Sequence, residues 1–300
     1  MADGAVKHDY HLVKPSPWPL LGSLSMLVMV LGVAGYLKGF WFIEKGTPWA
    51  PLPGFVALVF VLVGWWGDVL KESRAGDHKE VVQISLRYGM VLFIASEVMF
   101  FVAWFWGFFE MAIFHTFRAS AHADLANPDL ETMKGWNEWP VLQVDNTRVR
   151  PFDPFKLPLV NTLILLLSGT TVTWAHHALQ KNDRTGAKIG LLLTILLGMS
   201  FTLFQGIEYS EAGFGYDKSL YGSAFFMATG FHGAHVIIGT LFLIVCLLRL
   251  MAGGMKPDKH LGFEFAAWYW HFVDVVWLFL FAFVYVTPHL VWGSGPPGGE

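Results

Sequence analysis

The stretch FEFAAWYWHFVDVVWLFLFAFVYV, from Phe263 to Val286, decides the fold of this chain. It is apolar over a length that can cross a bilayer, for which a helix needs about 20 residues. It also carries His271 and Asp274, which lie three residues apart. This spacing places both on one helical face, and we interpret them as a structural pair that shares a proton or a hydrogen bond. Because a carboxylate at membrane depth is costly, we expect Asp274 to face protein or water.

The composition of the whole chain agrees with a membrane protein. Of 300 residues, 54% are hydrophobic and 14% are charged. Soluble domains average about 25% charged residues, so this chain cannot cover a water-facing surface. The net charge is -3 and no basic run is present, which argues against a nucleic-acid partner. Cys246 is the one cysteine, which excludes an internal disulfide, a CxxC metal site and a CxxCH haem attachment site.

Seven segments are long and apolar enough to span a membrane as helices. They are Ser16–Leu37, Gly46–Gly67, Tyr88–Phe109, Leu157–Asn182, Ile189–Ile207, Ser219–Leu248 and Phe265–Trp292. We therefore predict an all-α fold, a polytopic membrane protein with seven transmembrane helices. With no internal repeat and no second soluble domain in the sequence, residues 1–300 form a single membrane domain.

The distribution of lysine and arginine predicts the orientation of these helices. With the N-terminus inside, most basic residues of the short loops and termini lie on the inner side, as the positive-inside rule requires. We therefore predict that the N-terminus is inside and the C-terminus outside. Residues 116–156 form a long outer connecting loop, rich in the Pro, Asn and Asp that are typical of loops.

The start of the chain bears on its location. The first fourteen residues, MADGAVKHDYHLVK, contain no apolar core of a secretory signal. They also lack the Arg-rich, acid-free character of a mitochondrial presequence. We expect the chain to be made and used in one membrane system, the bacterial inner (plasma) membrane or otherwise the mitochondrial inner membrane.

Glu97 is the sharpest single candidate for function. It lies 10 residues after Arg87, or about 15 Å along a helix. This is near the middle of a hydrocarbon core roughly 30 Å thick, and Ser96 is its one local polar neighbour. One interpretation is a carboxyl that handles protons or gates lipid. The other is a protonated glutamate hydrogen-bonded to a neighbouring helix, and the sequence does not decide between them.

Histidines within the spans raise the question of haem or another metal. No two lie 13 or 14 residues apart in one span, the spacing of a two-haem cytochrome b. His232 and His235 share a helical face and could bind a metal between helices. Their surroundings favour close helix packing with interhelical hydrogen bonds instead, because four glycines lie nearby. These are Gly222, Gly230, Gly233 and Gly239. We therefore predict no metal site.

A third group of candidates lies at the inner end of the second span. It consists of Trp65, Trp66, Asp68 and Lys71. Tryptophans beside a cation at the interface form an aromatic belt, and can also hold a phospholipid headgroup. His78, Arg87 and Arg249 are further candidates for lipid contacts at this depth. Glu208 and Glu211, near the outer end of the fifth span, are expected to face water.

Several of these segments resemble subunit III of cytochrome c oxidase, in order, from about His8 to Tyr285. The segments are HDYHLVKPSPWPLLGS, WWGDV, LRYGMVLFIASEVMFFVAWFW, LPLVNTLILLLSGTTVTWAHHAL, FTLFQGIEYSEA, YGSAFFMATGFHGAHVIIGTLFLIVCLLR and GFEFAAWYWHFVDVVWLFLF. The resemblance covers all seven spans.

The resemblance implies an architecture and a set of partners. Helices I–II (residues 16–70) and a bundle of helices III–VII (residues 84–292) would enclose a V-shaped cleft that holds phospholipids. The chain itself would carry no haem or copper and would pack directly on subunit I. Haem a, haem a3, CuA and CuB would belong to partner subunits, subunit II among them, and cytochrome c would deliver electrons. The implied role is to hold lipid and to support proton uptake and long-lived turnover in subunit I.

The resemblance also assigns residues. Glu97 matches the buried mid-membrane glutamate of the family, and His232 and His235 match its helix VI histidines. Arg249 matches the basic residue that ends that helix. Trp65, Trp66 and Asp68 match the helix II signature. Gly67 departs from the mitochondrial pattern, which has arginine there, and this weakens the headgroup contact expected at that position.

Two alternatives remain. The equivalent subunit of a quinol oxidase would resemble only the last five helices, whereas this chain also has the first two. A stand-alone proton channel or transporter would use Glu97, but a conducting path needs polar groups at several depths. Ser16–Leu37 and Gly46–Gly67 offer almost none.

Overall fold

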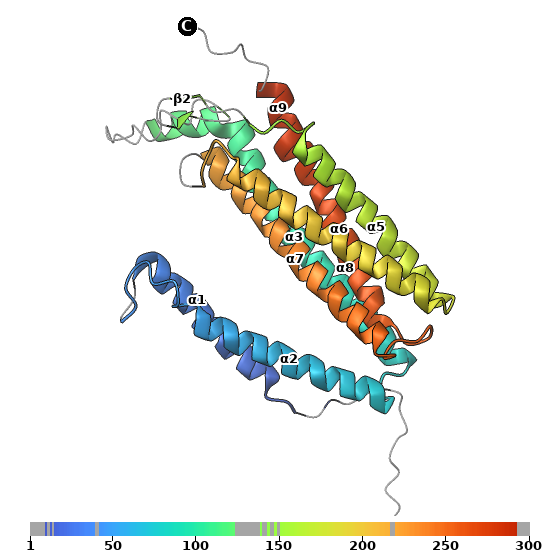
Figure 1. Ribbon diagram of the computed structural model, residues 1–300. Coiled ribbons are helices and arrows are strands. Elements are labelled where there is room, and N and C mark those ends of the chain that lie inside the picture. Colours follow the sequence, from blue (N-terminus) through green and yellow to red (C-terminus); the bar gives the residue numbers. More distant parts are fainter. Residues whose placement is uncertain are drawn as a thin grey trace, which may run out of the picture. The chain divides into compact units, whose positions relative to one another are not determined.

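The computed structural model describes residues 10, 13, 15–39, 42–123, 139, 143–144, 147–148, 151–216 and 220–292. These residues form seven helices that are long and apolar enough to cross a membrane, which confirms the all-α prediction (Figure 1). The helices are α1 (Trp18–Lys38), α2 (Leu52–Ala75), α3 (Glu80–Ala123), α5 (Leu157–Gln180), α6 (Arg184–Ser210), α7 (Leu220–Met251) and α8 (Leu261–Leu280). A π-helical segment, η2 (Phe281–Val286), and α9 (Thr287–Trp292) continue α8, and β1 (Gln143–Val144) pairs with β2 (Thr147–Arg148).

The chain divides into two compact units, residues 1–89 and 90–300. In the first unit α1 packs against α2, and small residues allow the two backbones to approach closely. A Cβ atom on Gly32 would meet the carbonyl of Ala50, and one on Gly54 would meet the backbone of Met29. A larger residue at either glycine would therefore force the two helices apart.

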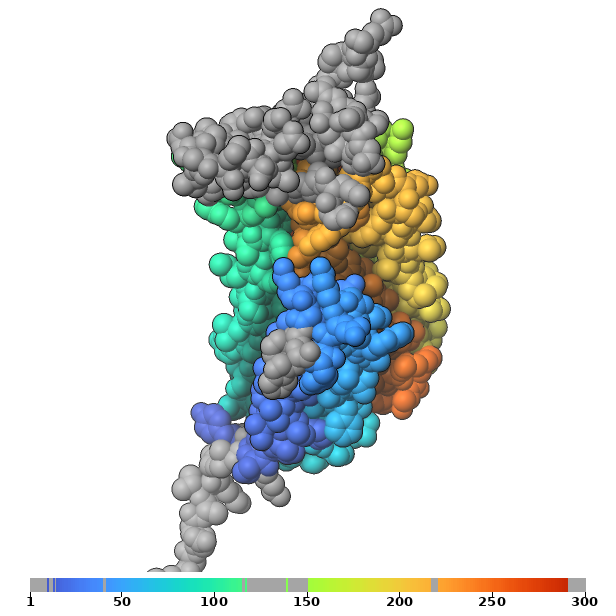
Figure 2. Space-filling model, turned by 90° about the vertical axis from the view of Figure 1, so that its left-hand side faces the viewer, coloured from blue at the N-terminus to red at the C-terminus, as the bar shows by residue number. Residues whose placement is uncertain are grey.

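The outward faces of this helix pair are apolar, as expected of surfaces that contact lipid. Leu20, Leu24 and Leu27 on α1 are exposed, and so is Phe60 on α2. Figure 2 draws the surface of these two helices in blue. An apolar surface of this kind is stable against hydrocarbon and not against water.

In the second unit, α5 and α6 form an antiparallel hairpin, and α8 packs against both α5 and α7. Two buried tryptophans of α8 fasten it to α5 by hydrogen bonds. Trp270 Nε1 donates to Ser168 Oγ at 2.8 Å, and Trp277 Nε1 donates to Thr162 Oγ1 at 2.8 Å. Each indole thus fills the core while its N–H is satisfied.

The close-packing interpretation of the glycines of α7 holds at one position and fails at another. A Cβ atom on Gly239 would lie 2.8 Å from Trp270 Cε3. A Cβ atom on Gly233 would have nothing within 4 Å. Gly239 therefore allows α7 to approach α8 closely.

The helix containing Glu97 continues to Ala123, so residues 116–123 of the predicted connection are helical. The part of this helix suited to cross a membrane is Glu80–Phe114. Hydropathy falls where polar and charged residues enter the sequence, but these residues continue the helix. Most of the remaining predicted loop lies outside the described residues, as does the C-terminal tail after Trp292.

Candidate functional site

The main candidate site is a carboxyl–imidazole pair between α3 and α7. Glu97 Oε2 lies 2.9 Å from His235 Nε2, and the two side chains are 22% and 12% exposed. His235 Nδ1 lies 2.7 Å from the carbonyl oxygen of Phe231, one helical turn earlier. A carbonyl can only accept, so Nδ1 carries a hydrogen. Nε2 and the carboxyl group therefore share one proton, either as a neutral pair or as a carboxylate with an imidazolium.

Aromatic rings surround this pair. Phe101 lies edge-on to His235 with ring centroids 4.9 Å apart, and Phe100 lies 5.9 Å from it. Tyr269 of α8 stacks on the imidazole at 6.3 Å. Phe100 and Phe101 follow Glu97 by three and four residues, so the helical repeat brings them to the same face. Such apolar walls exclude water and strengthen the hydrogen bond inside them.

His232 makes a second interhelical hydrogen bond. Its ring is fully buried, and Nε2 lies 3.1 Å from the carbonyl oxygen of Val273 in α8. Trp277 and Phe201 pack on it with ring centroids 5.0 and 5.7 Å away. The interhelical hydrogen bonding predicted for His232 and His235 is therefore confirmed. Within the described part of the chain, Nδ1 of His232 has no hydrogen-bond partner.

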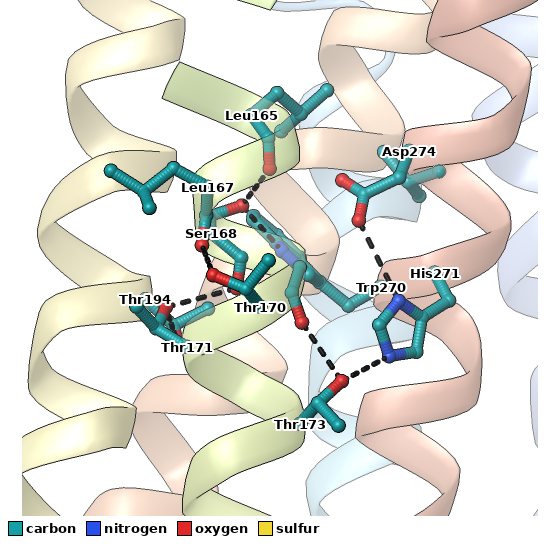
Figure 3. Close-up of polar contacts among 12 residues, drawn as sticks. Leu165, Leu167, Ser168, Thr170, Thr171, Thr173, Thr194, Trp270, His271 and Asp274 are labelled. Carbon is teal, nitrogen blue, oxygen red and sulfur yellow. Dashed lines mark hydrogen bonds and ion pairs between the residues drawn. The ribbon is translucent and has the colours of Figure 1, made fainter. Parts of the chain in front are cut away.

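His271 and Asp274 lie near each other, as their spacing predicts, but too far apart for the predicted hydrogen bond, and Thr173 is a third member of the group (Figure 3). His271 Nδ1 lies 3.7 Å from Asp274 Oδ2, and Nε2 lies 3.0 Å from Thr173 Oγ1 of α5. The Thr173 hydroxyl donates to the carbonyl of Gly169, so it accepts from the imidazole. Asp274 is 6% exposed, which confirms that it faces protein, whereas the His271 side chain is 46% exposed.

In the first unit, Asp68 is the centre of a polar group at the α1–α2 hairpin. It accepts hydrogen bonds from Trp18 Nε1 at 2.7 Å and from Lys71 Nζ at 2.8 Å. Trp65 and Trp66 are not part of this group and remain 40% and 61% exposed. Sequence reasoning missed Trp18 as a partner, although it lies in the quoted segment HDYHLVKPSPWPLLGS.

The other predicted lipid contacts lie on different elements of the chain. His78 is partly buried between α2 and α3, and its carbonyl accepts from Gln83 Nε2 at 3.1 Å. Arg87 lies in the first unit, on α3. Arg249 lies in the last turn of α7, and a Cβ atom on Gly262 would come within 2.9 Å of its Nη1.

The prediction that Glu208 faces water is wrong. Glu208 is only 2% exposed, and its Oε1 accepts a 2.6 Å hydrogen bond from the Tyr285 hydroxyl. Gln205 Nε2 donates to the same hydroxyl at 3.3 Å. Phe201, Gln205 and Glu208 are spaced as one buried stripe of α6, and this spacing was the signal available in the sequence. Glu211 lies one residue beyond the helix and is exposed.

Comparison with known proteins bears on the identity of this arrangement. A sequence model of the family described as cytochrome c oxidase subunit III matches residues 8–294. Cytochrome c oxidase subunit 3 of Triticum aestivum is 49% identical over 280 residues, which is 93% of this chain and 96% of that protein. The chain belongs to the cytochrome c oxidase subunit III family. It is thus related to a membrane-bound subunit of an oxidase complex.

Two further subunit III relatives are similar over most of their length. That of Arabidopsis thaliana is 48% identical over 280 residues, covering 93% of this chain and 96% of the relative. That of Cyprinus carpio is 47% identical over 289 residues, covering 96% of this chain and 98% of the relative. Among the described residues of this subunit III, no group of three or more His, Cys, Asp or Glu side chains could hold a metal ion.

Proposed function

We propose that this chain is the non-redox subunit III of an aa3-type cytochrome c oxidase. In this proposal it packs directly on subunit I, in a complex with subunit II, and supports proton uptake and sustained turnover during O2 reduction and proton pumping. Haem a, haem a3, CuA and CuB belong to the partner subunits, and cytochrome c is the electron donor. The family match begins at residue 8 and includes α1 and α2, which favours this oxidase over a quinol oxidase.

The location is part of the same proposal. The bacterial inner membrane, or otherwise the mitochondrial inner membrane, would hold the seven helices with the N-terminus inside and the C-terminus outside. Basic residues in the short loops support this orientation.

Phospholipid is the proposed ligand. The residues proposed to contact lipid at the inner interface are Trp65, Trp66, Asp68, Lys71, His78, Arg87 and Arg249. The exposed indoles of Trp65 and Trp66 support this assignment, because tryptophan favours the headgroup region.

The observation that carries the proton-handling proposal is the 2.9 Å contact between Glu97 Oε2 and His235 Nε2. A carboxyl group and an imidazole can each carry the proton that lies between them. A proton can therefore move within the pair without changing its net charge. A pair without net charge costs less free energy inside a membrane than an isolated charged group does. A purely packing role would not require two ionisable partners.

The first experiment compares the assembled oxidase with and without this chain through many turnovers of oxygen consumption. The proposal expects similar initial rates followed by faster loss of activity in the complex that lacks the chain. Identical and stable oxygen consumption in both complexes would show that the chain serves only in assembly.

A sharper version changes Glu97 alone. Glu97→Gln keeps a side chain that can donate to Nε2 of His235 but removes the acid. We expect normal assembly and accelerated loss of activity in this variant. Glu44→Gln, the same change at an exposed position, is the matched control and should behave as the unmodified complex. If the complexes with Glu97→Gln and Glu44→Gln lose activity at the same rate, a role of Glu97 in proton handling is contradicted.

A further inference from the structure

The outward face of α5 and α8, which pack against each other, carries polar side chains at membrane depth. His271 lies about 15 Å along α8 from Leu261, and Thr173 lies about 10 Å from the end of α5 at Gln180. The two side chains point toward each other, with His271 Nε2 3.0 Å from Thr173 Oγ1 (Figure 3). The exposed polar residues of this α5–α8 face are Thr170, Thr173 and His271.

His271 differs in its exposure from the other ionisable residues deep in the spans of the second unit. The Glu97 and His235 side chains are 22% and 12% exposed. That of Asp274 is 8% exposed, and His232 is fully buried. The His271 side chain is 46% exposed. Because ionisable side chains within membrane spans almost always face protein or a water-filled cavity, this chain leaves much of His271 to be covered by another molecule.

The outward faces of α6 and α7 have the apolar character expected of lipid contact. At comparable distances from the helix ends, their large exposed side chains are those of aliphatic residues and methionine. On α6 these are Leu192, Leu193, Leu196 and Met199, and on α7 they are Ile237, Ile238, Leu241 and Val245. The contrast within one bundle indicates that α6 and α7 face hydrocarbon and that the α5–α8 face does not.

The polar residues of the α5–α8 face suit contact with a helix of a different chain. Threonine is small enough to let two membrane helices approach closely, and its hydroxyl can form hydrogen bonds between them. A second copy of this chain would bring the same patch against itself, as a two-fold interface does. Asp274, the acidic residue beside His271, is buried and could not meet a second imidazole. A complementary polar group must therefore come from a different protein.

We propose that the α5–α8 face binds a transmembrane helix of a partner subunit of the oxidase, and that this helix places a hydrogen-bonding side chain against His271. The proposal rests on the proposed function and specifies the face through which the chain joins its partners. It also gives a reason for a polar group at this depth, because the imidazole is covered by protein only in the assembled complex.

The test introduces a photoreactive benzoylphenylalanine at Val275, one helical turn after His271 on α8, in the complete oxidase in its native membrane. Val275 is 52% exposed, and the matched control is Ile238 on α7, which is 55% exposed. The two positions lie about 21 and 20 Å from the helix ends at Leu261 and Met251, which one loop joins. They therefore compare two faces at one depth. Adducts formed on illumination are identified by mass spectrometry.

The probe at Val275 should form an adduct with another protein chain of the oxidase, whereas the probe at Ile238 should form lipid adducts alone. Lipid adducts alone at Val275, or an adduct with a second copy of this chain, would overturn the proposal. If the Val275 variant does not assemble, a probe at Leu166 replaces it and is judged in the same way, since Leu166 lies two turns before Thr173 on α5 and is 38% exposed. The haem spectrum of the unmodified purified complex tests the proposed function separately, so the two failures are distinguishable.

Discussion

The carboxyl group of Glu97 and the imidazole of His235 form a hydrogen bond of 2.9 Å between α3 and α7, although 138 positions separate them in the sequence. The Phe231 carbonyl fixes the hydrogen on His235 Nδ1 and so leaves Nε2 to share a proton with the carboxyl group. The bond thus has two functions that can be separated experimentally. It joins two helices, and it holds a proton that either group can carry.

Glu97→Ala should lower the stability of the chain within the complex, whereas Glu97→Gln should not. Alanine leaves Nε2 of His235 among aromatic rings without a partner, and an unsatisfied buried polar group costs about 1–3 kcal/mol. The amide of glutamine still donates to Nε2. Thermal dissociation of the subunit from purified oxidase measures the difference. Equal dissociation temperatures for the two variants would show that the hydrogen bond contributes no stability.

Gly239→Ala should destabilise the packing of α7 on α8, and Gly233→Ala should not. The new Cβ atom at position 239 would lie 2.8 Å from Trp270, whose ring is buried and held by Ser168. Overpacking of this kind typically costs about 1–3 kcal/mol. At position 233 nothing lies within 4 Å, and alanine favours the helix. Thermal unfolding of the two complexes should therefore give a lower midpoint for Gly239→Ala alone.

Hydropathy alone located the seven spans, because burial in lipid requires each helix to be apolar over its own length. The end of α3 was missed for the same reason. The segment after Phe114 is less apolar, yet its alanine and arginine residues still favour a helix. A local pattern therefore reports where a helix stops being apolar and not where it ends.

Hydrogen-bond partners that lie far apart in the sequence could not be predicted from it. His271 and Asp274 were correctly expected to lie near each other because they lie within one helical turn. The spacing of Phe201, Gln205 and Glu208 along α6 could have indicated that Glu208 is buried, and without it Glu208 was wrongly expected to face water. Its partner Tyr285 lies 77 positions away, and the helix packing that brings the two together is a tertiary property.

Asp274→Asn should disturb the retention of this subunit in the complex more than the pH dependence of turnover. Asp274 Oδ2 lies 3.7 Å from Nδ1 of His271, whose Nε2 contacts Thr173, and the amide would remove the acidic group from beside the imidazole. The subunit content of purified oxidase and the pH profile of oxygen consumption are measured together. A shifted profile at normal subunit content would instead indicate that the pair exchanges protons during turnover.

Thr173→Val offers an independent check on the same network, with Thr170→Val as the matched control. Both changes replace a hydroxyl by a methyl group on α5. The Thr173 hydroxyl contacts His271, whereas that of Thr170 contacts only the carbonyl of Leu167 among the contacts described. The subunit content of purified oxidase should fall with Thr173→Val and not with Thr170→Val. Equal subunit content for the two variants would argue against a role for the Thr173–His271 contact.

Trp18→Phe should loosen the α1–α2 hairpin. Phenylalanine keeps an aromatic ring against Phe60, 6.2 Å away, but removes the N–H that donates to Asp68. Hydrogen exchange in the first turns of α1 should therefore become faster. Trp66→Phe, at an indole that is 61% exposed, is the control and should leave the exchange of α1 unchanged.

Replacement of Trp66 together with Arg249 should lower the amount of phospholipid that remains bound to the purified complex. Indole and guanidinium groups are the two side chains best suited to hold a headgroup at the interface, the first by its amphipathic ring and the second by bidentate contact with phosphate. Phosphate analysis after delipidation measures the lipid stoichiometry. Each single variant should lose less lipid than the double variant, because one contact remains. An unchanged stoichiometry in the double variant would remove both residues from the proposed lipid site and leave the exposed indole as part of an ordinary aromatic belt.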